Sequence, residues 1–213
     1  VGNSPLPIPE LVPIPSAEKD LEDFSSVMVG RLFKILSEAC RRVDPNHLNL
    51  GARYYTVPPA WCLDGMKCFD VFSINCYEDR VPPDRVERIA SLLNQPVLVG
   101  EWHFGALDAG LPASGIGRVR DQKARGQAYR FYTEQAAALP ACVGVHWFTL
   151  YDESALGRYD GENWNIGFLD VCNRPYEDLA SSARASHERI YSVAAGELPP
   201  FADPPDYLPK LFL

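Results

Sequence analysis

The sequence predicts an α/β fold whose parallel sheet is buried on both faces, and three observations support this prediction. Segments of strand-like composition alternate with segments of helical periodicity along the 213 residues. The expected strands are continuous apolar runs, which are typical of strands covered on both sides. The loops after the expected strands are long and polar, whereas those before them are short. We count four strand–helix units, with one helix before the first strand.

The first helix is expected over 18–43, where apolar residues recur at helical spacing. It ends at the "DPNH" of 44–47, because a residue before proline avoids the helical conformation. A short strand follows within "HLNLGARYY", and the second strand is the run "FDVFSINCY" at 69–77. The segment 82–95 is a helix that starts at prolines.

The third expected strand is "PVLVGEW" at 96–102, and a loop of glycines and small residues follows over 105–117. A long amphipathic helix is expected over 118–139, a fourth strand over 142–150 and a last helix over 174–196. Residues 1–17 and 197–213 are rich in proline and are expected to form an arm and a tail. The β/α domain is therefore expected over 18–196.

The composition narrows the class of protein. The formal net charge of -8 argues against a nucleic-acid-binding protein, which normally has a basic stripe. No run approaches ~18 apolar residues, the length that a membrane span needs, and the N-terminus does not resemble a signal peptide. We therefore expect a soluble and cytoplasmic protein. None of the six cysteines forms a C-x-x-C pair, so free thiols are expected and no metal site is predicted; they are Cys40, Cys62, Cys68, Cys76, Cys142 and Cys172.

Polar and aromatic residues follow each strand core. Carboxylates, aromatic rings and an arginine at the carboxyl ends of parallel strands are what a carbohydrate site needs, because rings pack on sugar faces and carboxylates act on the anomeric bond. The residues are Arg53 and Tyr54; Asn75, Tyr77, Glu78 and Asp79; Glu101, Trp102 and His103; and His146, Trp147, Asp152 and Glu153.

Each of these residues also has a purely structural interpretation. Taken alone, Glu101 is more often an acid in a salt bridge after a core strand, and Trp102 and Trp147 are more often core residues. His146 is more often a hydrogen-bonded structural histidine than a ligand. His103 lies two residues after Glu101, so in an extended chain it points to the same side and can support the site by hydrogen bonding.

Five ordered motifs carry a resemblance to a known family: "DPNHLNLGARYY", "FDVFSINCY", "QPVLVGEWHFGALDAG", "GVHWFTLYDE" and "GRYDGENWNIGFLDVCNRPY". Together they resemble the C-terminal half of a clan A glycoside hydrolase, most closely the β-agarases and related β-galactosidase-type barrels. The resemblance covers roughly residues 20–192. It implies that the four strands are the fifth to eighth of a (β/α)8 barrel, so that this chain is a half barrel.

The resemblance also implies roles for individual residues. Glu101 matches the nucleophile of a retaining glycosidase, and Tyr77 matches the tyrosine that hydrogen-bonds that nucleophile. Trp147 matches the aromatic floor of the sugar subsite. Further candidates for substrate binding or support are Arg53, Trp102, His103, Asp160, Glu162 and Asn163. The family needs no metal or cofactor for this chemistry, so none is expected.

The sequence departs from the family in one respect. The family's general acid/base is a glutamate on the fourth strand, and this chain has no matching segment. A retaining mechanism needs two carboxyl groups about 5–5.5 Å apart. Three interpretations remain open: a fragment that lacks a complementary half barrel, a half barrel that pairs with a copy of itself, and a non-catalytic relic. In a homodimer, Glu153 or Asp152 at the end of the partner's last strand would replace the acid/base.

These observations predict a glycoside hydrolase-like protein that acts with retention on a β-linked neutral polysaccharide or oligosaccharide, as an agarase or galactosidase does. The alternative is a carbohydrate-binding or oligomeric scaffold protein that derives from such a barrel and has no turnover.

Overall fold

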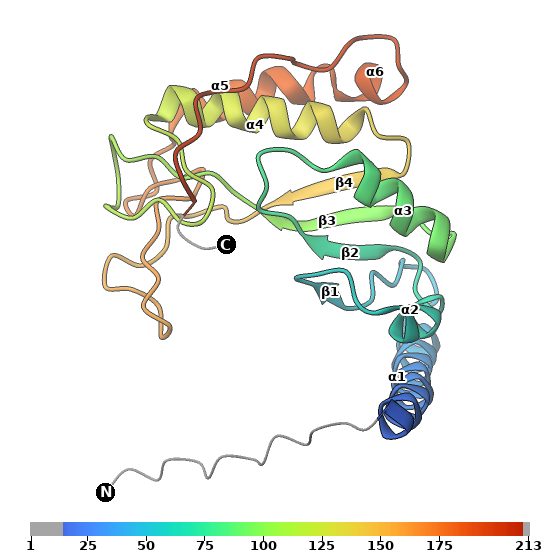
Figure 1. The fold of residues 1–213 in the computed structure, drawn as a ribbon. Helices are drawn as coiled ribbons and strands as arrows, with labels where there is room; N and C mark the ends of the chain where they lie inside the picture. The colour runs from blue at the N-terminus through green and yellow to red at the C-terminus, as the bar shows by residue number, and fades with distance from the viewer. Residues whose placement is uncertain (1–14, 211–213) are drawn as a thin grey trace, which may run out of the picture.

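The computed structural model describes residues 15–210 and contains one open sheet of four parallel strands in the order β1-β2-β3-β4 (Figure 1). This confirms the predicted parallel half barrel. The predicted arm of 1–17 lies mostly outside the described residues, as do the last three residues of the tail. The elements are α1 (Pro15–Val43), β1 (Arg53–Tyr54), α2 (Ala60–Met66), β2 (Phe72–Asn75), α3 (Pro83–Leu93), β3 (Val97–Trp102), α4 (Gln122–Ala137), β4 (Cys142–Trp147), α5 (Glu177–His187) and α6 (Ile190–Ala194).

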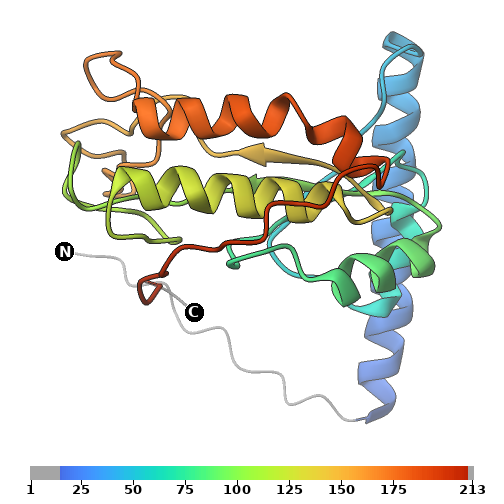
Figure 2. The same ribbon diagram turned by 90° about the horizontal axis from the view of Figure 1, so that it is seen from above.

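The helices flank the sheet from one edge to the other. Figures 1 and 2 show α4 and α5 side by side beyond β4, with α1 at the opposite edge beyond β1. Helix α4 lies close to β4 and brings aromatic side chains onto the sheet, where Tyr132 stacks on Trp102 with ring centroids 3.9 Å apart. No helix within residues 15–210 is long and apolar enough to cross a membrane.

Local signals explain where several helices begin and end. Helix α3 starts at a pair of prolines and ends at Asn94, whose left-handed backbone (φ 54°) terminates the helical hydrogen bonding. Helix α4 is capped by Asp121, whose carboxylate accepts a hydrogen bond from the Ala124 backbone N–H at 2.8 Å. Asn94 thus ends the helix before β3, and Asp121 begins the helix after the loop that follows β3.

The first strand and the last helix differ from their predicted forms, and one helix of the structure was missed. The first strand has only two residues and lies at the edge of the described sheet, where it pairs with β2. The last helix is two helices, since the helical backbone is interrupted at Arg189 (φ -121°). Helix α2 was not predicted at all. It packs on α1 where Gly65 meets Gly30, so closely that a Cβ on Gly65 would lie 2.9 Å from the Gly30 Cα.

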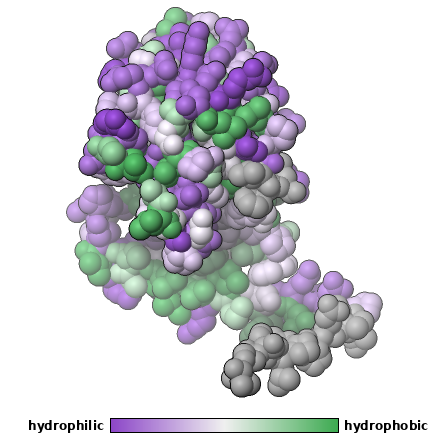
Figure 3. Space-filling model, turned by 90° about the vertical axis from the view of Figure 1, so that its left-hand side faces the viewer, coloured by the Kyte–Doolittle hydropathy of each residue, from purple (hydrophilic) through white to green (hydrophobic). Residues whose placement is uncertain are grey.

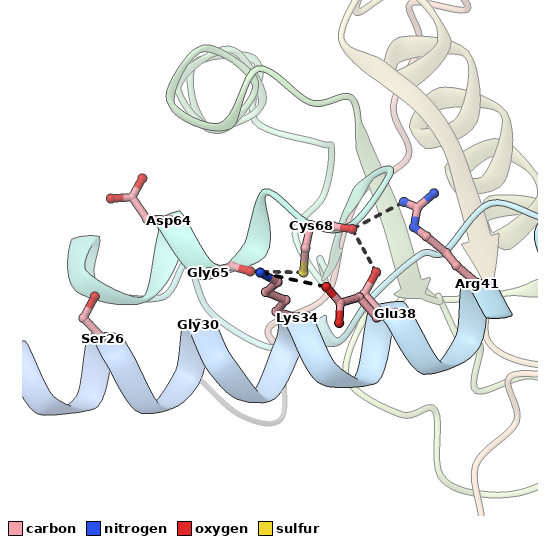
Figure 4. A pocket seen from close by; sticks show the side chains of 9 residues that line it. Ser26, Gly30, Lys34, Glu38, Arg41, Asp64, Gly65 and Cys68 are labelled. Carbon is pink, nitrogen blue, oxygen red and sulfur yellow. Dashed lines mark hydrogen bonds and ion pairs between the residues drawn. The ribbon is translucent and has the colours of Figure 1, made fainter.

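Helix α1 buries little of its apolar surface in this contact. Figure 4 shows the polar hollow between α1 and α2, where Lys34, Glu38, Arg41 and Cys68 lie. Phe33 packs on Phe69 at 5.2 Å. Val29 is also partly buried against the core, but most other large apolar side chains of α1 are at least half exposed: Leu21, Phe24, Val27, Met28, Leu32, Ile35, Leu36 and Val43. The space-filling view likewise shows hydrophobic surface gathered over the lower part of the molecule (Figure 3).

The segment after α6 runs back across α4. The backbone N–H of Phe201 donates to the buried Glu134 carboxylate at 2.9 Å, and Gln135 donates to the Phe201 carbonyl at 2.9 Å. Further along, Tyr207 packs on Phe104 with ring centroids 5.3 Å apart. These contacts hold the described part of the proline-rich tail against the helix that backs β3.

Candidate active site at the carboxyl ends of the strands

Three predicted site residues meet at the carboxyl end of the sheet. Glu101 is the second-last residue of β3, Tyr77 lies two residues after the end of β2, and Arg53 is the first residue of β1. The Tyr77 hydroxyl donates a short hydrogen bond to Glu101 Oε1, and Arg53 Nη2 lies 2.9 Å from Glu101 Oε2. Both carboxylate oxygens are therefore held, each by a side chain from a different strand.

The side chains of Glu101 and Arg53 are buried to different degrees, and Tyr77 has a shifted pKa. The Glu101 side chain is 14% exposed, whereas the Arg53 side chain is 52% exposed. Burial and the adjacent Glu101 carboxylate hold the pKa of Tyr77 well above its usual range. Tyr77 therefore stays protonated and remains a hydrogen-bond donor, so the carboxylate is oriented without being neutralised.

A hollow of about 310 Å³ lies beside Tyr77. It is bounded by the carboxyl end of β2 and by the loop that follows β1. An ion pair between Arg85 and Glu78 lies at its rim. The lining residues are Tyr55, Thr56, Val57, Ile74, Asn75, Cys76, Tyr77, Glu78 and Arg85. Of the three site residues, Tyr77 alone is among those that line this hollow, so the hollow adjoins Tyr77 but does not include Glu101 or Arg53.

His103 lies beneath this site rather than on its surface. Its side chain is 1% exposed, and Nε2 accepts a hydrogen bond from the Ile116 backbone N–H at 2.9 Å. Burial, with a smaller effect of the Arg125 charge, lowers the pKa of His103 to about 3, so the ring is neutral. It contacts Tyr77 edge to face at 4.8 Å, which makes it a support for Tyr77 and leaves it no direct access to a ligand in this structure.

The two predicted tryptophans pack on the helix side of the sheet. Trp102 is 1% exposed and stacks on Tyr132. Trp147 is half-buried, its ring edge lies against Trp102 at 4.7 Å, and its Nε1–H donates to the Ile166 carbonyl at 2.9 Å. The structure therefore places Trp102 in the core and Trp147 against it.

Besides Tyr77, two aromatic rings near His103 were not identified from the sequence. Phe148 lies 6.2 Å from it and Trp164 lies 5.4 Å from it, measured between ring centroids. Phe148 directly follows the predicted Trp147, but nothing in the local pattern distinguishes which of two adjacent aromatics faces the site.

Asp152 and Glu153 are each 7% exposed and have partners within this chain. Asp152 accepts hydrogen bonds from the Tyr176 hydroxyl at 2.6 Å and from the Gly167 backbone N–H at 2.8 Å. Glu153 accepts from the Trp164 backbone N–H at 2.9 Å and pairs with Arg158 at 3.0 Å. Either residue would have to give up these bonds to act in a neighbouring chain.

The loop after β4 gathers the remaining predicted acids around one arginine. Arg158 pairs with Asp160 and lies 3.2 Å from Glu162 Oε2. Burial raises the pKa of Glu162. Asn163 is half-buried in the same loop. The sequence showed these acids but not Arg158 as their common partner.

A buried arginine connects the loops after β3 and β4. Arg125 on α4 is fully buried and donates to the Phe104 carbonyl at 2.7 Å and to the Gly167 carbonyl at 2.6 Å. Its guanidinium lies 5.6 Å from the Trp147 ring centroid. Sequence reasoning missed this residue, because a lone arginine in an amphipathic helix is normally at the surface.

No family model matches the chain. It is 33% identical to β-agarase B of Vibrio sp. (strain JT0107) over 180 residues, which are 83% of this chain and 19% of that protein. It is 30% identical to β-agarase A of the same strain over 200 residues, 90% of this chain and 20% of that protein.

A solved exo-β-agarase has the same fold over 87% of this chain and 25% of its own length, with a TM-score of 0.80 and 32% sequence identity. The chain thus spans about a fifth of the length of the curated relatives and a quarter of the solved one. It is a homologue of the β-agarases and corresponds to a four-stranded part of a glycoside hydrolase of that kind.

Proposed function

We propose that this chain supplies the nucleophile half of a retaining glycoside hydrolase site that acts on a β-linked neutral galactan of the agarose type. The observation that carries the proposal is the Glu101 carboxylate, held by Tyr77 and Arg53 at the carboxyl end of a parallel strand. Active sites of β/α barrels lie at this end of the strands. The relationship to β-agarases supports the substrate class.

In the proposed reaction Glu101 attacks the anomeric carbon of the sugar and forms a glycosyl ester, while the bond to the leaving oxygen breaks and that oxygen takes a proton from the general acid and departs as an alcohol. Water then hydrolyses the ester with overall retention of configuration. Arg53 and Tyr77 hold the two carboxylate oxygens so that one lone pair points at the anomeric carbon. The remaining contacts to the sugar ring would come from Phe148, Glu162 and Asn163. Arg53 thereby supports the nucleophile, in addition to any contact with the sugar.

We further propose that the general acid/base comes from a complementary β/α unit. In the resemblance above, this glutamate belongs to the strand before β1. Within the described residues, Asp152 and Glu153 are used in hydrogen bonds of this chain, which supports a donor on another unit. The exposed edges of β1 and β4 and the apolar face of α1 are the surfaces that such a unit would cover.

The arrangement of helices favours a complement that differs from this chain. A closed ring of two copies would join the β4 strand of one copy to the β1 strand of the other. Helix α1 precedes β1 and helices α5 and α6 follow β4, so both would compete for the same seam. A complement of four strands and three helices fills the ring without this conflict, because each seam of a β/α barrel takes one helix.

Hydrolysis of 2,4-dinitrophenyl β-galactoside tests the proposed nucleophile. Dinitrophenolate leaves without protonation, so a site that lacks its acid should still release it. We expect measurable release by the wild-type chain, with loss of at least about 100-fold in Glu101→Gln, and little change in Glu78→Gln as a matched control on the neighbouring loop. Equal rates in wild type and Glu101→Gln would contradict the proposal, and binding of agaro-oligosaccharides without turnover would favour the non-catalytic alternative.

Light scattering of the purified chain tests the proposed complement. Because the seam has room for one helix, we expect no discrete twofold dimer that depends on β4. The opposite result would be a stable dimer of twice 23.7 kDa that is abolished by the edge substitution Val143→Lys. This result would contradict the proposed complement and favour the homodimer.

A further inference from the structure

Gly100, the residue directly before Glu101, lies at an irregularity of β3. Ile74 pairs with Val99 and Asn75 pairs with Glu101, so Gly100 has no partner on β2. The register with β4 also shifts between Val99 and Trp102. An extra residue of this kind is a β-bulge, and bulges beside functional sites re-aim the side chains that follow them.

The side chains on either side of the bulge show this change of direction. Val97 and Val99 are each 1% exposed and belong to the core on the helix side. Strict alternation would place Glu101 on that side too, two residues after Val99. Instead Trp102 packs on the helix side against Tyr132, and Glu101 faces the open side of the sheet.

The missing side chain of Gly100 also leaves room for another residue. A Cβ at this position would lie 2.6 Å from Arg53 Cδ, 2.9 Å from Arg53 Cγ and 2.6 Å from Ser73 Oγ. Real Cβ atoms do not approach other heavy atoms so closely. The aliphatic part of Arg53 therefore lies directly over Gly100.

The course of the Arg53 side chain follows from the strand register. Arg53 on β1 lies opposite Ser73 on β2, and its guanidinium reaches Glu101 on β3. The side chain thus crosses the whole width of β2 on the open side of the sheet. Only small residues lie beneath it, Ser73 on β2 and Gly100 on β3.

We propose that Gly100 is a positioning residue for Glu101, which acts through both its bulge and its lack of a side chain. The bulge turns the carboxylate to the open side of the sheet, and the absence of a Cβ lets Arg53 cross to Glu101 Oε2. The catalytic meaning of this arrangement rests on the proposed function, but the geometry does not.

Arginine side-chain NMR tests the proposal without any need for hydrolysis. The Arg53 Nε–H signal, identified by its loss in Arg53→Lys, should report the pair with Glu101 and should shift in Glu101→Gln. We expect Gly100→Ala to give the Glu101→Gln position of this signal. The matched control is Gly144→Ala on β4, where a Cβ would meet only Leu98 Cδ1 at 3.0 Å, and we expect it to keep the wild-type signal. A wild-type Arg53 signal in Gly100→Ala would overturn the proposal.

Thermal unfolding provides a second arm in case Gly100→Ala folds poorly. In Arg53→Ala the new methyl group has space, since the Ser73 hydroxyl can rotate away. We expect the loss of melting temperature caused by Gly100→Ala to fall by at least half in that background, and the double variant to fold even if the single one does not. An equal loss in both backgrounds, or a double variant that does not fold, would overturn the proposal. The expected NMR and unfolding results do not depend on whether Glu101 is a nucleophile. A failure of the Gly100 proposal can therefore be distinguished from a failure of the proposed function.

Discussion

At the scale of single residues, the site depends on how the two oxygens of one carboxylate are held. Tyr77 and Arg53 reach Glu101 from two different strands. The sequence predicted Glu101 and Tyr77 from the motifs in which they occur, and it suggested Arg53 as a residue for substrate binding or support. The pairing of Arg53 with Glu101 was not predictable, because it depends on a bulge and on two small residues beneath the side chain.

The hydroxyl of Tyr77 can be removed with little change in volume. Tyr77→Phe leaves Glu101 Oε1 without its donor, so we expect the release of dinitrophenol from the activated β-galactoside to fall by about 10- to 100-fold. Tyr55→Phe is the matched control, because Tyr55 lines the same hollow but is 70% exposed. Initial rates of the two variants at matched folded concentration check this expectation, which fails if both variants behave alike.

His103 makes the stability of the chain depend on pH. Its pKa falls from 6.5 to about 3 on folding, mainly because of burial. Below pH 6.5 the unfolded chain takes up a proton here that the folded chain does not, so stability is full above pH 6.5 and is lost as the pH falls toward about 3. The loss is at most about 1.4 kcal/mol for each pH unit.

His103→Gln keeps an acceptor for the Ile116 N–H and removes this titration. We expect urea unfolding of the variant to show a flatter dependence on pH between about 6 and 4 than the wild type. His47→Gln is the control, since the side chain of His47 is 86% exposed. An unchanged slope in His103→Gln would mean that other groups cause the acid sensitivity.

At the scale of elements, the long segments were predictable, and so were ends with a local signal, such as the end of α1 at Val43 and the start of α3 at its prolines. Continuous apolar runs located β2, β3 and β4, and helical spacing located α1, α3 and α4. The break between α5 and α6 was missed, because the helical periodicity continues through it. Helix α2 was missed because its seven residues are stabilised by close packing of glycines on α1, which no local pattern reveals.

Helix α4 joins the loops after β3 and β4 through a buried charge. Arg125→Met removes donors to the Phe104 and Gly167 carbonyls and leaves the buried Asp152 without a nearby cation. We expect the free energy of unfolding to fall by about 3 kcal/mol or more, measured by urea denaturation. Arg120→Met, at an exposed position, should change it by less than about 0.5 kcal/mol. Similar small effects in both variants would show that the network contributes little.

Helix α1 offers two neighbouring residues with opposite environments. Phe33 packs on Phe69, whereas Leu32 is 51% exposed. We expect Phe33→Ala to lower the free energy of unfolding by about 2 kcal/mol and Leu32→Ala to change it by less than about 0.5 kcal/mol. Urea denaturation of the isolated chain measures both. If Leu32→Ala is as destabilising as Phe33→Ala, the apolar face of α1 is already covered in the isolated chain.

At the scale of the whole molecule, the sequence predicted an open half barrel and the structure confirms it. The absence of the family's acid/base glutamate, which the sequence also indicated, has the same origin. A four-stranded part of a barrel contains only the site residues of its own strands, and this glutamate belongs to another strand. The apolar face of α1 was visible in the sequence only as apolar residues. The predicted half barrel already implied open edges, whereas the exposure of the apolar face of α1 among the described residues required the structure.

Trapping with 2-deoxy-2-fluoro-β-galactosyl fluoride tests most directly whether Glu101 is a nucleophile. Fluoride leaves without an acid, and the fluorine at C2 slows hydrolysis of the glycosyl ester, so the half site alone should accumulate the adduct. We predict a single fluorogalactosyl group on the peptide that contains Glu101, identified by mass spectrometry, and no labelling of Glu101→Gln. Labelling on another carboxylate, or equal labelling of Glu101→Gln, would contradict the claim.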